Sequence, residues 1–288
     1  MTYYSDEERK LLKNIEDSPT YKLAEDDKDF LKEYETRGVR LELDYLKAEL
    51  TMKNYGIEHT VAIFGSARVL PQDVAKAKVD ELINKKASSE EVKRATKILN
   101  NSFYYEDARE LGRIIGSSGK EPKDNRVIVM TGGGPGIMEA ANRGAWEAGA
   151  NSIGLNIKLP HEQHPNPYIT PELCMQFHYF SIRKFHFFQR AKAMIVYPGG
   201  FVTMDELFEL LTLKQTKSMK QIPVILIGKQ WWHNLLNLEF LIEEGMISKD
   251  NLKIFKVVNS AKEAWIEILN WYKQRGEPLF NESESEGL

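Results

Sequence analysis

Short apolar runs alternate along most of the chain with longer segments in which apolar residues recur at helical spacing. The apolar runs span residues 61–64, 127–130, 153–157, 193–197, 223–227 and 254–258. The helical segments span residues 105–117, 135–148, 181–192, 204–217, 231–244 and 261–274. Continuous apolar strands that alternate with helices are typical of a parallel sheet covered on both faces. The pattern therefore predicts an α/β protein with a Rossmann-like, doubly wound parallel sheet, for which residues 174–178 are a candidate further strand.

Three segments stand outside this alternation. Residues 1–58 are charged and rich in helix formers, and apolar residues between positions 27 and 53 recur at helical spacing, which predicts an N-terminal helical extension. Residues 71–102 are a charged stretch that predicts an inserted pair of helices within a Rossmann-like domain of residues 59–276. Residues 277–288 are polar and acidic, and we expect them to be disordered.

Composition narrows the classes of partner and location. The 288 residues are 42% hydrophobic and 28% charged, with a net charge of -3, which gives no reason to expect nucleic acid or a membrane surface as a partner. The single cysteine, Cys174, leaves no internal disulfide to form. No apolar run reaches the roughly 18 residues that cross a bilayer, and the first residues are acidic, unlike a signal peptide. We therefore expect a cytoplasmic protein.

Three loops rich in small residues follow predicted strands, at the sheet edge where α/β proteins bind ligands. The first is Gly65-Ser66-Ala67-Arg68, directly after the strand at 61–64. A tight turn with a solvated arginine explains this loop as well as a ligand contact does.

The second loop contains Gly132, Gly133, Gly134 and Gly136 between a predicted strand and a predicted helix. Successive glycines let the backbone approach a ligand without Cβ clashes, and the N–H groups at a helix start form an anion site. The loop matches neither the dinucleotide fingerprint nor the P-loop. Glu139, in the first turn that follows, is a candidate for binding ribose hydroxyls or merely a favourable acidic residue near a helix start.

The third loop contains Gly199 and Gly200, followed by Thr203 and Glu206. Thr203 and Glu206 have the spacing of a capping box, which is a structural role. The functional interpretation is that the backbone amides and Thr203 hold phosphate while Glu206 does acid–base work. Two glycine-rich loops of this kind in one sheet indicate a phosphorylated ligand more strongly than either loop does alone. Arg183, with Lys184 beside it, is a further candidate cation for that ligand.

These motifs, in their order and approximate spacing, resemble the Lonely Guy (LOG) family. The residues that carry the resemblance are 131–142, the dipeptide Arg183-Lys184, and Pro198-Gly199-Gly200 with Thr203 and Glu206. The resemblance runs from about residue 61 to residue 271, apart from the insertion. Family members are often labelled lysine decarboxylase-like. Their characterised activity is a phosphoribohydrolase that releases the base and ribose 5-phosphate from AMP or cytokinin riboside 5′-monophosphates.

The resemblance implies roles for particular residues. Arg183 and Glu206 correspond to the family's catalytic pair, and residues 132–136 and 199–203 correspond to its phosphate loops. It also implies a nucleoside 5′-monophosphate as substrate and a homodimer or higher homo-oligomer as the assembly. A carboxylate at Glu206 would stabilise an oxocarbenium-like transition state and orient water, while Arg183 would bind phosphate or ribose hydroxyls.

One position departs from the family pattern, because Val202 stands where the second phosphate motif has glycine. If that glycine has a positive φ, valine is strongly disfavoured there. The valine side chain would also crowd a phosphate. The hypothesis is that the loop is remodelled and the activity weakened or lost, and that Val202→Gly raises turnover or nucleotide affinity.

The same residues also fit alternatives to the hydrolase. A non-catalytic nucleotide-binding or sensing protein of the same fold is the main one, and Val202 favours it. A pyridoxal phosphate enzyme is disfavoured because Lys184 and Lys192 both fall in a predicted charged helix. The segment 161–164 resembles a metal-ligand pair, but it lies between two prolines and is not expected to be helical, so we expect no metal. With pyridoxal phosphate disfavoured, we also expect no cofactor. The aromatic residues between 177 and 188 are candidates for a base pocket, although such clusters more often form core or interface.

Overall fold

The structure is a computed structural model that describes residues 3–119, 121, 124–159, 164–277 and 279. Its contacts divide the chain into two compact units, one up to Lys47 and one from Ala48 onward. The division lies earlier than residue 58 because Ala48 and Met52 are buried in the core of the second unit. Most of residues 277–288 lie outside the described residues, so the expectation of a disordered tail stays a prediction.

The first unit holds the helix α1 (Asp6–Glu16), the short 3-10 helix η1 (Phe30–Lys32) and the start of α2 (Arg37–Asn54). A capping box begins α1, because Ser5 Oγ accepts from the Glu8 N–H at 3.3 Å and the Ser5 N–H donates to Glu8 Oε2 at 2.7 Å. These reciprocal bonds satisfy two of the N–H groups that a helix start leaves free.

A parallel sheet forms the centre of the second unit, with the strand order β4-β3-β2-β1-β5-β6-β7. The strands are β1 (Thr60–Phe64), β2 (Ile128–Thr131), β3 (Ser152–Ile157), β4 (Cys174–Phe177), β5 (Ala191–Val196), β6 (Val224–Ile227) and β7 (Lys256–Val258). Each pairing is parallel, and β1 pairs with β2 on one side and with β5 on the other. The candidate strand near residues 174–178 is confirmed as β4.

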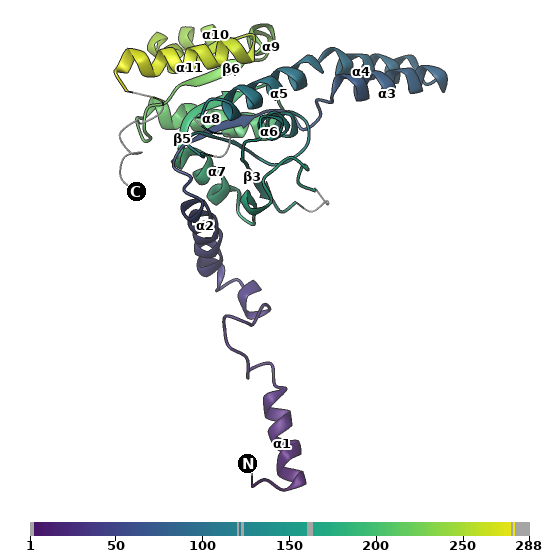
Figure 1. Cartoon of the computed structure of the whole chain (residues 1–288), viewed down its shortest axis with the longest axis vertical. Coiled ribbons are helices and arrows are strands. Elements are labelled where there is room, and N and C mark those ends of the chain that lie inside the picture. Colours follow the sequence, from purple (N-terminus) through teal and green to yellow (C-terminus); the bar gives the residue numbers. More distant parts are fainter. Residues whose placement is uncertain (1–2, 120, 122–123, 160–163, 278, 280–288) are drawn as a thin grey trace. The chain divides into compact units, whose positions relative to one another are not determined.

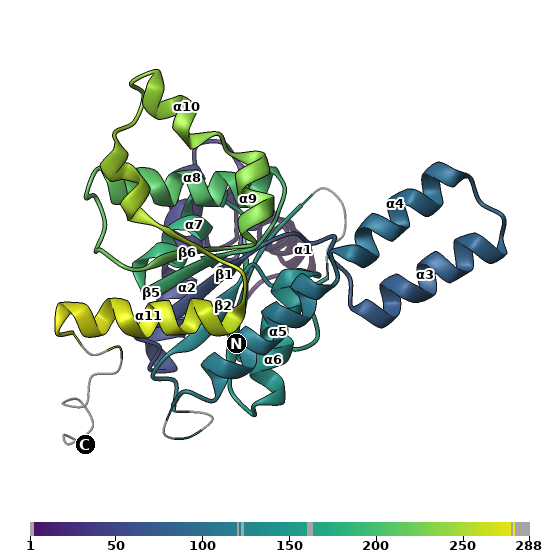
Figure 2. The same cartoon turned by 90° about the horizontal axis from the view of Figure 1, so that it is seen from above.

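Helices cover both faces of the sheet, because successive strand side chains point to opposite sides. Val61 and Ile63 of β1 pack into a core with α5 (Phe103–Gly116), α6 (Ile137–Glu147) and α11 (Ala261–Arg275). Ala62 and Phe64 pack into the opposite core with α7 (Phe180–Gln189), α8 (Phe201–Gln215) and Trp232 of α9 (Lys229–Leu235). Figures 1 and 2 show these layers. The predicted Rossmann-like α/β class is confirmed.

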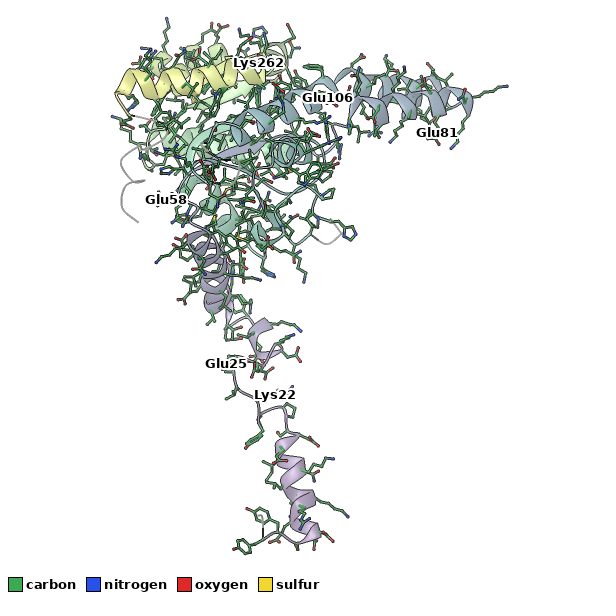
Figure 3. The ribbon with its side chains drawn as sticks, in the orientation of Figure 1. Lys22, Glu25, Glu58, Glu81, Glu106 and Lys262 are labelled. Atoms are coloured by element: carbon green, nitrogen blue, oxygen red, sulfur yellow. The ribbon has the colours of Figure 1, made fainter. Side chains whose placement is uncertain are left out.

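The inserted segment forms two helices, α3 (Gln72–Asn84) and α4 (Ser89–Asn100), between β1 and α5. The two helices pack against one another and extend away from the sheet as a hairpin (Figure 2). Charged side chains lie on the outside of the second unit, as Glu81 on α3 and Lys262 on α11 do (Figure 3).

Most helix boundaries lie within two residues of the predicted ones, and three predicted helices differ by more than that. The predicted helix at 181–192 ends at Gln189, and Lys192 lies in β5 instead, within a run of six buried residues. The predicted helix at 231–244 is two helices, α9 and α10 (Leu238–Glu243), because Leu236 is extended and the Asn237 side chain caps a new start at the Phe240 N–H. The helix predicted from residue 204 begins earlier, at Phe201.

The chain order reverses between β1 and β5. The connection from β1 passes through α3, α4 and α5 to β2, whereas the connection from β5 passes through α8 to β6 on the other side. The loops after these neighbouring strands therefore diverge toward opposite faces. In a parallel α/β sheet, such a divergence opens a crevice at the carboxyl edge, where ligands bind.

Candidate active site

A cavity of about 740 Å³ lies at this carboxyl edge of the sheet. Its walls come from the loops after β1, β2 and β5, from α7, and from side chains near residues 98–104 and 231–235. Eight of the residues predicted from the sequence line it, namely Gly65, Ser66, Gly132, Arg183, Gly199, Gly200, Thr203 and Glu206. Folding therefore brings together residues that are up to 141 positions apart, which is the separation of Gly65 and Glu206 (206 − 65).

Ser66 joins the three glycine loops through its backbone. Its N–H donates to the carbonyl of Pro198 at 2.9 Å, and its carbonyl accepts from the N–H of Ile137 at 3.1 Å. Its Oγ accepts from the N–H of Arg68 at 3.1 Å. A Cβ on Gly65 would lie 2.7 Å from the Ile137 side chain, so a larger residue would push the loops apart. The first loop is thus both a cavity wall and the joint between its neighbours.

Arg183 reaches the cavity from α7 and fills the space beside Gly132. A Cβ on Gly132 would lie 2.6 Å from Arg183 Nη2. The guanidinium carbon lies 5.3 Å from the ring centroid of Phe187 and 6.0 Å from that of Phe180, within cation–π range. Arg183 Nε is buried and has no hydrogen-bond partner within the described part of the chain.

Glu206 faces Arg183 across the cavity wall, with 3.5 Å between Oε1 and Nη2. Only 6% of each side chain is exposed. Burial raises the pKa of Glu206 to about 7, although the positive charge of Arg183 opposes the shift. Burial also lowers the pKa of Arg183, which Glu206 opposes. Near neutral pH the carboxyl of Glu206 is therefore divided between its protonated and ionised forms, which suits acid–base catalysis.

The first turn of α8 lies at the cavity without a side-chain cap. Its N-cap residue is Gly200, in an extended conformation, and no side chain of the described residues caps the helix. The structural alternative for Thr203 and Glu206, a capping box, is therefore wrong. Thr203 lies inside the first turn. Its Oγ1 is so close to Gly199 that a Cβ added to this glycine would lie only 2.2 Å from it. The N–H groups of this turn and the positive end of the helix dipole form a candidate anion site.

Val202 belongs to the same first turn. It is not among the described residues with positive φ, so the backbone carries none of the strain that a valine in a glycine-only conformation would cause. Its side chain is 53% exposed and lines the cavity. Backbone strain therefore gives no reason to expect an effect from Val202. Crowding of a phosphate by its side chain remains a reason.

The triple-glycine loop is held mainly by the protein itself. The Gly133 N–H donates to Thr131 Oγ1 at 2.9 Å, and the carbonyls of Gly133 and Gly134 accept from Asn166 at 2.8 and 3.1 Å. Gly133 and Gly136 have φ of 70° and 74°, a conformation that glycine favours. Gly133, Gly134 and Gly136 do not line the cavity, so these three predicted phosphate-binding residues shape the loop that presents Gly132.

A buried asparagine network under this loop was not predicted. Asn142 Oδ1 accepts from Thr131 Oγ1 at 2.7 Å and from Asn166 Nδ2 at 3.0 Å, while Asn142 Nδ2 donates to Ser152 Oγ at 2.9 Å. Asn142 ends the sequence motif that carried the family resemblance, which was the available signal. Asn166 lies in a segment without helical or strand periodicity, and nothing local marked it.

Two predicted site residues are bound elsewhere. Glu139 Oε1 accepts from the Tyr105 hydroxyl at 2.7 Å and lies outside the cavity lining. Lys184 bridges α7 to α8, with Nζ 3.1 Å from Asp205 and 2.5 Å from Glu209. Both side chains have structural partners in this conformation. Of the predicted aromatic cluster, Phe180 lines the cavity, whereas Phe177 and Phe187 belong to the core.

No lysine stands among the described residues that line the cavity, so a Schiff-base cofactor has no attachment point there. Across the same residues, no group of three or more histidine, cysteine or acidic side chains is arranged to hold a metal ion. The segment 161–164 falls largely outside the described residues, and its candidate metal pair is not placed.

None of the helices described is both long enough and apolar enough to span a membrane.

Comparison with known proteins agrees with the motifs at this site. A family model described as possible lysine decarboxylase matches residues 138–268. Cytokinin riboside 5′-monophosphate phosphoribohydrolase LOG1 of Arabidopsis thaliana is 30% identical over 169 residues, which cover 57% of this chain and 74% of that protein. The LOG3 protein of the same plant is 29% identical over 167 residues, which cover 56% of this chain and 73% of that protein.

Among solved structures, a structural genomics target titled TM1055 matches with a TM-score of 0.46 and 22% identity, over 74% of this chain and 99% of that one. A molybdenum cofactor binding protein from Rippkaea orientalis matches with a TM-score of 0.44 and 16% identity, over 75% and 98% of the two chains. The assignment rests on the sequence relatives together with the motifs gathered around Arg183 and Glu206. The chain belongs to the Lonely Guy (LOG) family, whose curated relatives are named phosphoribohydrolases.

Proposed function

We propose that this protein hydrolyses the N-glycosidic bond of a nucleoside 5′-monophosphate, such as AMP or a cytokinin riboside monophosphate, to the free base and ribose 5-phosphate. The observation that carries the proposal is the buried pair of Arg183 and Glu206 beside the uncapped first turn of α8, in one cavity. The pair supplies charge at the reacting bond, and the helix start supplies a site for the phosphate.

The phosphate would bind at the first turn of α8. That turn offers free N–H groups, the positive end of a 15-residue helix, and the side chain of Thr203. The start of α6 is less suited, because the Ile137 N–H already donates to the Ser66 carbonyl. Binding energy from this non-reacting phosphate would hold the ribose against Glu206.

The ribose and base would extend from α8 toward β2 and β3. Arg183 lies against Gly132, which follows β2, so the reacting bond would lie on that side of the phosphate. Beyond the pair, the apolar side chains of Ile157, Leu159 and Phe180 continue the wall. An apolar end with an aromatic ring suits a purine or a substituted purine.

In the reaction, the bond between C1′ and the base nitrogen breaks as positive charge develops on the ribose ring. The ionised Glu206 carboxylate would stabilise that charge and accept a proton from the attacking water, whose oxygen bonds to C1′. The departing base takes up one proton from solvent and Glu206 afterwards releases its proton to solvent, so one water is consumed and base and ribose 5-phosphate are the balanced products. Arg183 would hold the ribose hydroxyls or phosphate, and its positive charge would favour the ionised form of Glu206.

The test is an incubation of the purified protein with AMP, GMP, CMP and isopentenyl-AMP, in which free base and ribose 5-phosphate are followed by chromatography. Release from a monophosphate but not from the matching nucleoside is the expected result. Absence of release from all four would refute the hydrolase. If AMP still bound by calorimetry in that case, the protein would be a nucleotide-binding protein, the function that Val202 at the cavity wall favours.

We further propose a homodimer or larger homo-oligomer. Support comes from α2, where the exposed residues Val39, Leu43, Leu46 and Leu50 recur at alternating spacings of four and three, as in helix–helix seams. Light scattering on the purified protein measures the assembly directly. A monomer at micromolar concentration would contradict this proposal and leave the reaction untouched.

A further inference from the structure

The cavity continues past α8 on the side away from the catalytic pair. Five residues form this part, which we call the β6-side subsite: Arg68, Asn101, Tyr104, Trp231 and Leu235. They come from the loop after β1, the end of the inserted hairpin, the start of α5, and α9. The proposed hydrolysis uses none of them.

The sheet order places this subsite relative to the proposed phosphate. Arg183 lies by Gly132 after β2, the first turn of α8 follows β5 with Glu206 in the same helix, and α9 follows β6. From β3 to β6 the cavity wall crosses four strand spacings, roughly 19 Å in all. A phosphate at α8 would therefore have the nucleoside on its β2 side and the β6-side subsite on the other.

The aromatic side chains of the subsite are held in place by packing against α9 and Trp232. A Cβ on Gly228 would lie 2.5 Å from the Tyr104 hydroxyl, so Tyr104 packs directly over the start of α9. Trp231 stands edge-on to Trp232 with 4.7 Å between ring centroids, and Trp232 Nε1 donates to the Ile227 carbonyl at 3.0 Å. Fixed aromatic side chains lose little entropy on binding, which makes them suitable stacking surfaces.

The positive charge that the cavity offers a phosphate lies in the β6-side subsite. Among the residues that the structure describes, the charged ones that line the cavity are Arg68, Arg183 and Glu206. Arg183 is offset by Glu206, whereas Arg68 forms no ion pair with any of the residues described. A planar guanidinium matches phosphate oxygens in two-point hydrogen bonding. Asn101 adds an amide, which pairs with the donor and acceptor groups of a base.

We propose that the β6-side subsite binds a second nucleotide half, so that the cavity takes 5′,5′-dinucleotide pyrophosphates as well as monophosphates. The inference rests on the proposed function for the position of the first phosphate. Arg68 contacts the second phosphate, the second base stacks on Trp231 with Tyr104 behind it as a fixed wall, and Asn101 pairs with the edge of the base. The ligand class is two nucleosides joined through their 5′ positions by two phosphates.

The experiment is isothermal calorimetry on the full chain with AMP, ADP and diadenosine 5′,5′-pyrophosphate. We expect AMP to bind most weakly, ADP more tightly and the dinucleotide most tightly. The dinucleotide should bind at least about tenfold more tightly than AMP. Trp231→Leu should lower the dinucleotide affinity about tenfold and leave AMP within about twofold. Arg68→Gln, on an exposed loop, should weaken ADP and the dinucleotide more than AMP. Trp271→Leu is the matched control, since Trp271 is a half-buried tryptophan of α11 outside the cavity.

A dinucleotide that binds no more tightly than AMP would overturn the inference. So would a Trp231→Leu protein that loses AMP and dinucleotide affinity by the same factor. Failure of the proposed function looks different, because it is absence of base release from monophosphates, whatever the order of affinities. Absence of binding by all three ligands overturns the phosphate position and the subsite together.

Discussion

Gly132 and Arg183 occupy adjoining space, such that a Cβ on Gly132 would lie 2.6 Å from Arg183 Nη2. Real Cβ atoms do not come so close to another heavy atom, so any other residue at 132 would displace the guanidinium. Gly132 is not among the described residues with positive φ, and its backbone would tolerate a side chain. This glycine is therefore required for the position of a neighbouring side chain rather than for its own conformation.

Gly132→Ala should consequently reduce turnover by at least about tenfold, because a misplaced catalytic group loses orientation. The protein should remain folded, with a melting temperature close to that of the wild type. Steady-state kinetics and thermal denaturation together check this. Gly38→Ala, in α2 where nothing lies within 4 Å of the added Cβ, is the control and should leave turnover unchanged. Equal turnover in both variants would show that Arg183 need not hold this position.

Glu206→Gln should abolish base release and leave AMP binding nearly intact, because the amide keeps the shape of the carboxylate without its negative charge. Base release by chromatography and AMP affinity by calorimetry are the two readouts. Glu209→Gln provides the comparison on the same helix, since Glu209 pairs with Lys184 outside the cavity. If Glu206→Gln retained turnover, the carboxylate would have no catalytic role.

The raised pKa of Glu206 predicts how activity depends on pH. Turnover should rise through about pH 7 as the carboxyl ionises, and Glu209→Gln should move that midpoint somewhat lower, because the negative charge of Glu209 contributes to the raised pKa of Glu206. A flat kcat profile between pH 6 and 8 would argue against ionised Glu206 as the working form.

The same shift makes a prediction for stability, with the opposite sense. The folded-state pKa lies above the ordinary value of 4.5, so the folded protein holds this proton more tightly than the unfolded chain. That contribution is full below pH 4.5 and is lost as the pH rises through about 7. Glu206→Gln should therefore raise the melting temperature at pH 8 relative to wild type more than at pH 4.5. Thermal denaturation at both pH values measures the difference, and an equal change at the two would contradict the linkage.

Val202→Gly tests whether the side chain at this position crowds the phosphate. Because no backbone strain is present at Val202, an increase in AMP affinity or turnover would come from added space. Val202→Ala is the informative partner, since alanine removes bulk and retains helix propensity that glycine lacks by about 1 kcal/mol. Both variants should bind AMP more tightly than wild type. No change in either affinity or turnover would remove Val202 as an obstacle.

Asn142→Ala should destabilise the protein through the network beneath the triple-glycine loop. Removal of the buried amide leaves the partners at Thr131, Ser152 and Asn166 without one hydrogen bond each. Each unsatisfied buried group costs about 1–3 kcal/mol, and each kcal/mol lowers the melting temperature by roughly 2–4 °C for a domain of this size. Thermal denaturation is the measurement, with the exposed Asn234→Ala as control. A shift no larger than that of the control would show that the network is dispensable.

The sequence by itself determined the α/β class and the edge of the sheet at which the site lies. Apolar runs at 61–64 and 193–197 are long enough and apolar enough to be buried parallel strands, and the glycine loops follow them directly. Both signals are local, because hydrophobic periodicity and glycine content act within a few residues. Arg183 and Glu206 were also identified from the sequence, through motif resemblance, and the cavity holds both.

Only the tertiary structure decided which glycines line the cavity and what the others do. Gly133 and Gly136 look no different from Gly132 in the sequence, yet their surroundings are Asn156 and the Ser66 carbonyl, whereas Gly132 meets Arg183. Tyr104 and Trp231 carry no local signal at all, because they line one cavity only when the chain after β1 and the chain after β6 return to one edge of the sheet. Strand order determines such meetings, and it depends on burial summed over the whole sheet rather than on any short stretch of residues.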